Sequence, residues 1–497
     1  MSTSQPSISK SGGPPDRWLA LVFIGLAQLM IVLDVTIVNI ALPSAQRDLG
    51  ISDGDKAWVI TAYTLAFGGL LLLGGRVADY AGRRRAFLVG LVGFAGASAL
   101  GGAAPGFGTL LAARGLQGAF AALLAPAVLS LLTVNFTEQR DRAKAFGIFG
   151  AIAAGGGAVG LVVGGFLTEY LDWRWCLYVN VPIAVVAALG WRFLPADTPR
   201  EGARGRIDVP GALLAVTGLV AVVYACSEAE SEGWGSGPVT GLLALGALLL
   251  AGFVLVERRA RQPLLPLGVV ASRTRGSAYL AVALAVVGMF GMFLFLTYYM
   301  QVVKGYSAVL TGTAFLPLTA GVLVGAGGIA TRLLPRVPPR VLLVPGLLLA
   351  AAGTGWLTRI EASTSYAAGV LPAELLVGVG MGLVMAPAMN YATHGVRDEE
   401  AGIASATVNT SQQIGGSIGT AVLNTVATSA AADFLAGRRP TPELVNDALV
   451  DGFAAAYGVA SVVLVGAAVV IAVLMNTPRP DASKAAAGAH GAAVHVG

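Results

Sequence analysis

Residues 57–85 are AWVITAYTLAFGGLLLLGGRVADYAGRRR, an apolar run that ends in a short basic loop. About 20 apolar residues in a helix are enough to cross the roughly 30 Å hydrocarbon core of a bilayer. The arginines that follow favour the cytoplasmic side, where membrane proteins retain positive charge. This stretch therefore predicts a transmembrane helix followed by an inner loop.

The same pattern recurs along the whole chain. Of its 497 residues, 56% are hydrophobic and 12% are charged, and the mean hydropathy is +0.75. A soluble domain carries about 25% charged residues, so this composition excludes a soluble enzyme, a disordered chain and a nucleic-acid binder. We predict an all-α polytopic membrane protein with fourteen spans, near 18–42, 57–76, 86–104, 108–133, 144–167, 176–195, 209–226, 238–256, 276–300, 309–331, 341–358, 367–391, 402–427 and 453–475.

The order of these spans predicts two six-helix bundles with an inserted two-helix hairpin. Basic residues concentrate in alternate loops, which places both termini in the cytoplasm. The expected division is a disordered tail at 1–16, a bundle at 17–195, a linker and hairpin at 196–257, a second bundle at 258–476 and a disordered tail at 477–497.

The inner loop at 75–84 combines glycines, an acid and bases, and we predict a gating role for Gly75, Asp79, Gly82, Arg83 and Arg84. Glycine permits close packing or a turn, and the acid can cap a helix or pair with a base. An ordinary positive-inside loop is the alternative. The loop resembles the pattern of the major facilitator superfamily, Gly-x-x-x-Asp-Arg/Lys-x-Gly-Arg/Lys-Arg/Lys, except that Tyr80 replaces a base. The resemblance implies that the loop latches a gate.

Asp34 and Arg114 are ionisable residues inside predicted spans. A carboxylate such as Asp34 costs a few kcal/mol in a membrane helix unless it is paired, protonated or hydrated. Arg114 in span four has a comparable cost and is expected to face an acid, with Gln117 one helical step away. A charge that merely reaches the outer interface, or a purely structural buried pair, is the alternative. The segments resemble the span-one signature of fourteen-span drug:proton antiporters and the Arg-x-x-Gln-Gly pattern of span four, which implies proton coupling at Asp34 and Arg114.

Span five carries glycines every four residues, at Gly156, Gly160 and Gly164, followed by Gly165. Such a stripe lets another backbone approach closely, and packing alone is one interpretation. With Gly147, the spacing resembles the family's antiporter motif, which implies a gating role during exchange. Leu161 stands where that motif has proline, so the built-in kink is missing.

Other polar and aromatic residues fit a transport pathway less specifically. Tyr63 and Tyr298 can line an adaptable pocket, although core packing is the alternative for each. With Gln117 and Gln301, they are the predicted substrate-binding residues. Glu374 is a weaker second candidate for a membrane carboxylate. The cysteines Cys176 and Cys226 fit no metal motif and are interpreted as buried thiols, with a bridge between them as the alternative.

The resemblance implies a proton-coupled exporter of amphipathic small molecules, such as antibiotics, that works by alternating access in the cell membrane. A proton entering down 100 mV supplies about 2.3 kcal/mol. An importer or symporter of a small metabolite is the alternative. The motifs of an ATP pump and of a membrane enzyme are missing from the sequence. We therefore expect no cofactor or metal, and as partners only substrate, protons and lipid around a monomer. The excess of arginine over lysine, with abundant alanine and glycine, is typical of an actinobacterial genome.

Overall fold

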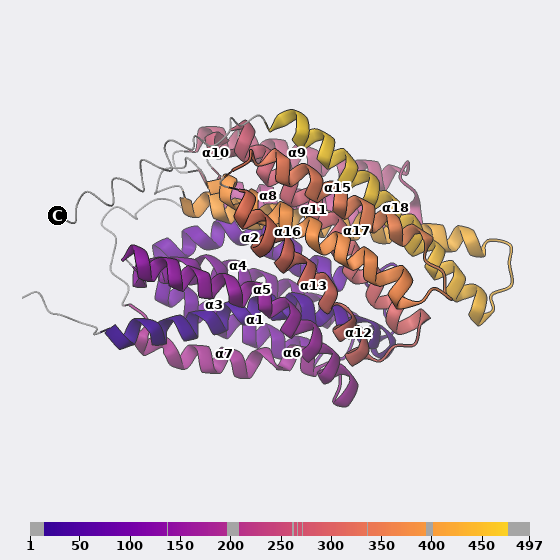
Figure 1. Ribbon diagram of the computed structural model, residues 1–497, viewed down its shortest axis with the longest axis horizontal. Helices are drawn as coiled ribbons and strands as arrows, with labels where there is room; N and C mark the ends of the chain where they lie inside the picture. Colours follow the sequence, from indigo (N-terminus) through magenta and orange to yellow (C-terminus); the bar gives the residue numbers. More distant parts are fainter. Residues whose placement is uncertain are drawn as a thin grey trace, which may run out of the picture.

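The computed structural model describes residues 14–136, 138–195, 208–260, 263–265, 267–270, 272–334, 336–393 and 401–475. Within these ranges, every regular element is a helix. Residues 1–13 of the first predicted tail, the linker stretch 196–207 and the predicted tail at 477–497 lie outside the described residues. Figure 1 shows the helices lying side by side along one common direction.

Five long helices and one broken helix make up the first part of the chain. They are α1 (Pro14–Leu49), α2 (Trp58–Ala81), α3 (Arg83–Gly102), α4 (Phe107–Asn135), α5 (Gln139–Tyr170), and the consecutive pieces α6 (Trp175–Tyr178), α7 (Asn180–Leu189) and η1 (Gly190–Phe193). The hairpin that follows consists of α8 (Val209–Glu232) and α9 (Gly237–Arg259).

The last part of the chain begins after the short helix α10 (Leu267–Val270) and again contains six spans. They are α11 with η2 (Arg273–Tyr298, Tyr299–Val303), α12 to α14 with η3 (Ala308–Ala314, Leu316–Leu323, Val324–Ala330, Thr331–Leu333), α15 with η4 (Arg340–Trp356, Leu357–Arg359), η5 with α16 (Tyr366–Val370, Leu371–Thr393), α17 (Ala401–Leu435) and α18 (Pro442–Leu474).

Thirteen helices are long and apolar enough to cross a membrane, counted over the residues that the structure describes. The long helix α5 covers the position predicted for the remaining span, 144–167. The predicted all-helical, polytopic fold is therefore confirmed.

Two helices extend further than hydropathy predicts. Helix α1 continues through Pro43 to Leu49 rather than ending near residue 42. Helix α18 starts at Pro442 rather than near residue 453. Both extensions carry charged residues, which lower the hydropathy of a window but do not interrupt the helical backbone. Proline inside a membrane helix is tolerated because neighbouring groups satisfy the freed backbone.

The hairpin packs against both halves of the molecule, since α8 contacts α2 and α17. The start of α1 lies on the left in Figure 1, and the α17–α18 connection lies at the opposite end, from which α18 runs back towards the upper middle of the view. We call that opposite end, where α1 finishes and α2 starts, the outer end, following the predicted topology.

Candidate functional site

Asp34 is the centre of a buried polar cluster between α1, α4 and α7. Arg114 Nη1 donates to its Oδ2 at 2.7 Å, while Gln117 Nε2 and Asn180 Nδ2 donate to its Oδ1 at 2.9 and 2.8 Å. All four residues are at most 1% exposed. The predicted pairing of Asp34 with Arg114 is therefore present, and the carboxylate accepts three hydrogen bonds.

The position of Arg114 is fixed from three further directions. Its Nε donates to the Val59 carbonyl at 3.0 Å and its Nη1 to Gln117 Oε1 at 2.9 Å. The guanidinium carbon also lies 4.5 Å from the centre of the Tyr63 ring, within range of a cation–π contact. A buried charge pair repays its desolvation only when its remaining donors and acceptors are satisfied, and these hydrogen bonds use three of the five guanidinium N–H donors.

Two members of the cluster were not among the predicted site residues. Ser98 Oγ accepts from Gln117 Nε2 at 2.6 Å and from Asn180 Nδ2 at 3.2 Å. Ser98 lies in a glycine- and alanine-rich stretch of α3, and Asn180 starts α7. Both are uncharged polar residues within spans, which hydropathy windows tolerate, so only their depth in the membrane could have indicated a role.

A small cavity of about 10 Å³ lies beside Arg114 towards the outer end, close to the smallest volume that holds one water molecule. Its other walls come from the outer half of α1 and the α6 region and include Val38, Ala45, Trp173 and Cys176. Asp34 is thus nearly sealed on this side. Cys176 and Cys226 are both buried free thiols, so the alternative of a bridge is wrong.

The glycine stripe of α5 packs directly on the helix that carries Asp34. A Cβ at Gly156 would lie 3.1 Å from Leu29 Cδ1, one at Gly160 would lie 3.1 Å from the Leu33 carbonyl, and one at Gly164 would lie 2.8 Å from Ile37 Cγ1. These distances are too short for a side chain without movement of the neighbours. Because these glycines have no side chain, the backbones of α5 and α1 can pack in close contact.

The next glycine in α5 faces the other half of the molecule. A Cβ at Gly165 would meet the backbone of α12 at Ala308 and Val309. In return, Gly312 of α12 abuts the Leu161 carbonyl. Helix α5 therefore contacts α1 along one stretch and α12 at its outer end, so a shift in one contact can be transmitted to the other.

Three polar contacts between the two halves lie at the outer end. Gln301 Nε2 donates to the Ile40 carbonyl at 2.9 Å, and Asn424 Nδ2 donates to the Gly54 carbonyl at 3.1 Å. The Val309 amide donates to Glu169 Oε2 at 2.9 Å. We call this set of contacts, with the α5–α12 packing, the outer junction.

Tyr298 also belongs to the outer junction rather than to an open pocket. Lys56 Nζ lies 4.4 Å from the centre of its ring, and Lys56 also pairs with Asp53 at 3.0 Å. Of the predicted substrate residues, Tyr63 and Gln117 thus lie in the Asp34 cluster, and Tyr298 and Gln301 lie in the junction. Their part in substrate binding stays a prediction.

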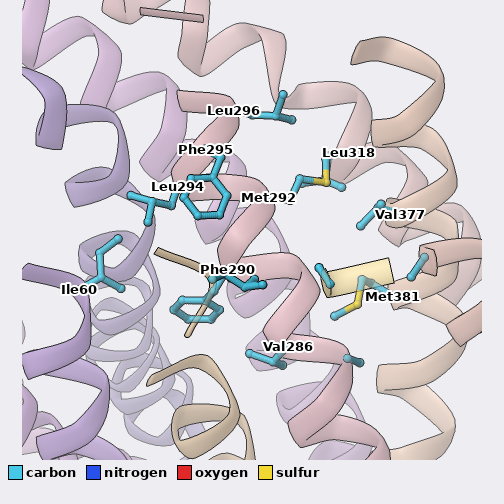
Figure 2. Close-up of a cluster of buried hydrophobic side chains, with 14 of the residues drawn as sticks. Ile60, Val286, Phe290, Met292, Leu294, Phe295, Leu296, Leu318, Val377 and Met381 are labelled. Atoms are coloured by element: carbon cyan, nitrogen blue, oxygen red, sulfur yellow. The ribbon is translucent and has the colours of Figure 1, made fainter. Parts of the chain in front are cut away.

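Apolar side chains reinforce this contact between the halves. Figure 2 shows Ile60 of α2 on one side of α11, near Leu294 and Phe290, with Val377 and Met381 of α16 on the other side. All belong to one continuous buried cluster.

The loop predicted to gate the inner side joins α2 to α3. Gly82 has φ +100°, a conformation that other residues rarely adopt, so glycine is needed for the sharp turn. Arg76 Nη2 donates to the Pro263 carbonyl at 2.8 Å, and the Arg84 guanidinium lies 4.4 Å from the Trp191 ring centre. A Cβ at Gly75 would lie 3.7 Å from Pro126 Cβ, which is an ordinary van der Waals contact, so this position tolerates a small side chain. The side chain of Asp79 lies outside the described residues.

Comparison with known proteins shows which family this chain belongs to. Residues 24–420 match the family model described as Major Facilitator Superfamily. The chain is 57% identical over 473 residues to the puromycin resistance protein pur8 of Streptomyces alboniger, covering 95% of this chain and 94% of the relative. It is 41% identical to the cephamycin export protein CmcT of Amycolatopsis lactamdurans, covering 82% and 85% of the two chains.

The fold also matches that of solved transporters. A bacterial homologue of the human lysosomal transporter Spinster, in an inward-facing and unoccupied conformation, superposes with a TM-score of 0.63 at 17% identity, covering 93% of this chain and 96% of that one. Together with the family match over most of the sequence, this establishes the chain as a multi-pass membrane protein that belongs to the Major Facilitator Superfamily.

Proposed function

We propose that this protein is a proton-coupled exporter of amphipathic antibiotics, and the buried Asp34 cluster is the observation that carries the proposal. Asp34 has one strong ionic partner, Arg114, and neutral donors for its remaining bonds. Adding a proton removes the negative charge and leaves Arg114 without its counter-ion inside the membrane. Such a change costs several kcal/mol unless the helices rearrange, so protonation and helix movement are coupled.

The substrate class rests on the relatives. One is named for puromycin resistance and another for cephamycin export, and a third, 32% identical over 463 residues, is the lincomycin resistance protein of Streptomyces lincolnensis. We propose puromycin as the first compound to test, because the relative named for it covers 95% of the chain at 57% identity.

The proposed cycle is alternating access. The substrate loads from the cytoplasm while the outer junction is closed. Opening of that junction, through movement of α5 against α1 and α12, exposes Asp34 to the outside. A proton then binds Asp34 and substrate leaves. The proton enters down its gradient, which supplies about 2.3 kcal/mol per 100 mV and drives the return.

The remaining assignments are part of the same proposal. Gly75, Asp79, Gly82, Arg83 and Arg84 form the inner latch, and the α5 glycines act in gating. We propose cytoplasmic termini, a monomer, and the proton-motive force in place of a cofactor. Among the residues that the structure describes, no group of three or more His, Cys, Asp or Glu side chains could hold a metal ion.

Asp34→Asn tests the proposal. The amide keeps the size of the side chain but cannot be ionised, so we expect loss of puromycin resistance in a sensitive host when the variant and the wild type are compared at matched protein levels. Uptake into everted vesicles under an imposed proton gradient should also disappear. Asp451→Asn, which changes an exposed carboxylate of α18, is the matched control and should behave as wild type. Full export by Asp34→Asn that survives collapse of the proton gradient contradicts the proposal.

A further inference from the structure

Glu374 is a second buried carboxyl group, and the Asp34 mechanism does not use it. It lies in α16 and is 0% exposed. One oxygen, Oε2, lies 3.0 Å from the Tyr366 hydroxyl, and the other, Oε1, has no hydrogen-bond partner. Among the described residues, the ion pairs within 4.0 Å do not include Glu374. An ionised carboxylate in such a place would be very costly.

The hydrogen bonds of Tyr366 indicate whether Glu374 is buried as the protonated acid or as the carboxylate. The Tyr366 hydroxyl also lies 2.6 Å from the Ala314 carbonyl, which can only accept. A phenol has one hydrogen to donate. We assign this hydrogen to the shorter contact, with the Ala314 carbonyl. The Tyr366 oxygen must then accept from Glu374, and a carboxyl group donates only when it is protonated.

Among the residues that the structure describes, no helix packed against α16 brings a base towards this acid. Helices α13 and η3 have no ionisable side chain, and the phenols in electrostatic reach are Tyr366 and Tyr457, with Tyr299 and Tyr306 beyond them. The charged residues of α11, α15 and α17 lie in terminal turns, namely Arg273, Arg275, Arg340 and Asp433.

The charged side chains of the adjacent outer segments also do not pair with Glu374. Arg359 and Glu361 are exposed, and Lys304 Nζ donates to the Ala362 carbonyl at 3.0 Å. The carboxyl group of Glu374 is thus surrounded by neutral groups.

Tyr366 connects this acid to the outer junction. The carbonyl that it contacts belongs to Ala314, the last residue of α12. The same short helix packs on α5 through Gly165 and Gly312 and donates its Val309 amide to Glu169. When α12 withdraws from α5, the Tyr366–Ala314 contact is the one nearest to Glu374 that can break.

We propose that Glu374 is a second proton-binding site, loaded from the outer solution, and that the outer junction closes only over the protonated acid. On opening, the carboxyl O–H bond breaks and the proton passes to water outside, leaving a hydrated carboxylate. On closure, a proton from that solution restores the acid before it is buried. This inference rests on the proposed exporter function. It adds a protonation step to the cycle but no net proton transfer, because the proton leaves to and returns from the outer solution.

The test measures outer opening against pH without transport. Spin labels are placed at two exposed outer positions, Leu171→Cys and Ala436→Cys, in a chain whose native cysteines are replaced by alanine, and their distance is recorded in lipid nanodiscs. The background is Asp34→Asn, so that Glu374 is the remaining membrane carboxyl of interest. If closure takes up one proton, the open-to-closed ratio rises about tenfold per pH unit across the titration range.

Adding Glu374→Gln should abolish this slope and keep the labels close at every pH, whereas the exposed control Glu443→Gln should leave it intact. Tyr366→Phe removes the acceptor of the acid proton and should move the titration to lower pH. A flat profile in the Asp34→Asn background, an unchanged slope after Glu374→Gln, or an unmoved midpoint in Tyr366→Phe overturns the proposal. Failure of the exporter function appears separately, as absence of proton-driven vesicle uptake in the wild type.

Discussion

The two halves of this transporter each bury an ionisable side chain at a similar position, but in opposite surroundings. Arg114 comes seven residues after Phe107, where α4 starts, and Glu374 comes eight residues after Tyr366, where η5 starts. Arg114 is paired with a carboxylate and donates to three acceptors. Glu374 has a single hydroxyl. The first half therefore buries a salt bridge, whereas the second half has surroundings that suit only a neutral acid.

The largest effect is expected from breaking the paired half. Arg114→Leu leaves Asp34 buried without a cation, and removal of one partner from a buried pair costs about 3–5 kcal/mol. We expect a strong drop in thermal stability in detergent and loss of export. Arg192→Leu, at an exposed position in the same half, is the control and should change neither. A stable, active Arg114→Leu protein would show that the pair is dispensable.

The second effect concerns the contact through which the halves communicate. Gly165→Val and Gly312→Val each push a side chain into the facing backbone, and overpacking of this kind costs about 1–3 kcal/mol. Closure of the outer junction should weaken, so vesicle uptake should fall about tenfold or more. Gly155→Val, which meets open space, should transport normally. Equal activity of all three variants argues against a close α5–α12 contact in the cycle.

The sequence predicts the paired half of this comparison far better than the other half. The number of spans follows from hydropathy, and Asp34 and Arg114 are visible as rare charges in apolar runs. Ser98 and Asn180 could not be identified, because small polar residues cost little in a span and their meeting depends on tertiary packing. The role of Glu374 depends on Tyr366 and Ala314, which helix packing brings together and no local pattern indicates.

A third, smaller effect should come from the neutral donors to Asp34. Asn180→Leu removes the bonds to Asp34 and Ser98. Arg114 and Gln117 still donate to the carboxylate, so vesicle uptake should fall by less than about tenfold. Ser98→Ala, which leaves the three donors of Asp34 in place, should lower uptake less. Uptake by Asn180→Leu equal to or above that of Ser98→Ala would contradict this assignment.

The smallest effect is expected at the exposed edge of the outer junction. Although partial burial opposes it, the Lys56 ammonium and the Gln46 amide keep the pKa of Asp53 below its ordinary value. A carboxyl group with a lowered pKa contributes stability above its unfolded pKa and loses it as pH falls through the folded value. The Asp53 side chain is 60% exposed, so the contribution is at most about 1 kcal/mol.

This edge can be tested by thermal unfolding at neutral and at acidic pH. Asp53→Asn should lower the melting temperature slightly at neutral pH and converge with wild type in acid. A difference that grows as the pH falls has the wrong sign for this pair.

The measurement that tests the central claim most directly is a count of protons moved by the purified protein. In proteoliposomes with a trapped pH-sensitive dye, puromycin added to the loading side should cause an opposite flow of protons in the wild type. Asp34→Asn should abolish both flows. Glu374→Gln should leave the number of protons exchanged per puromycin molecule unchanged, because Glu374 releases its proton to the outer solution and takes it back from there. Proton flow of wild-type size in Asp34→Asn would contradict the account, because the coupling carboxylate would then lie elsewhere.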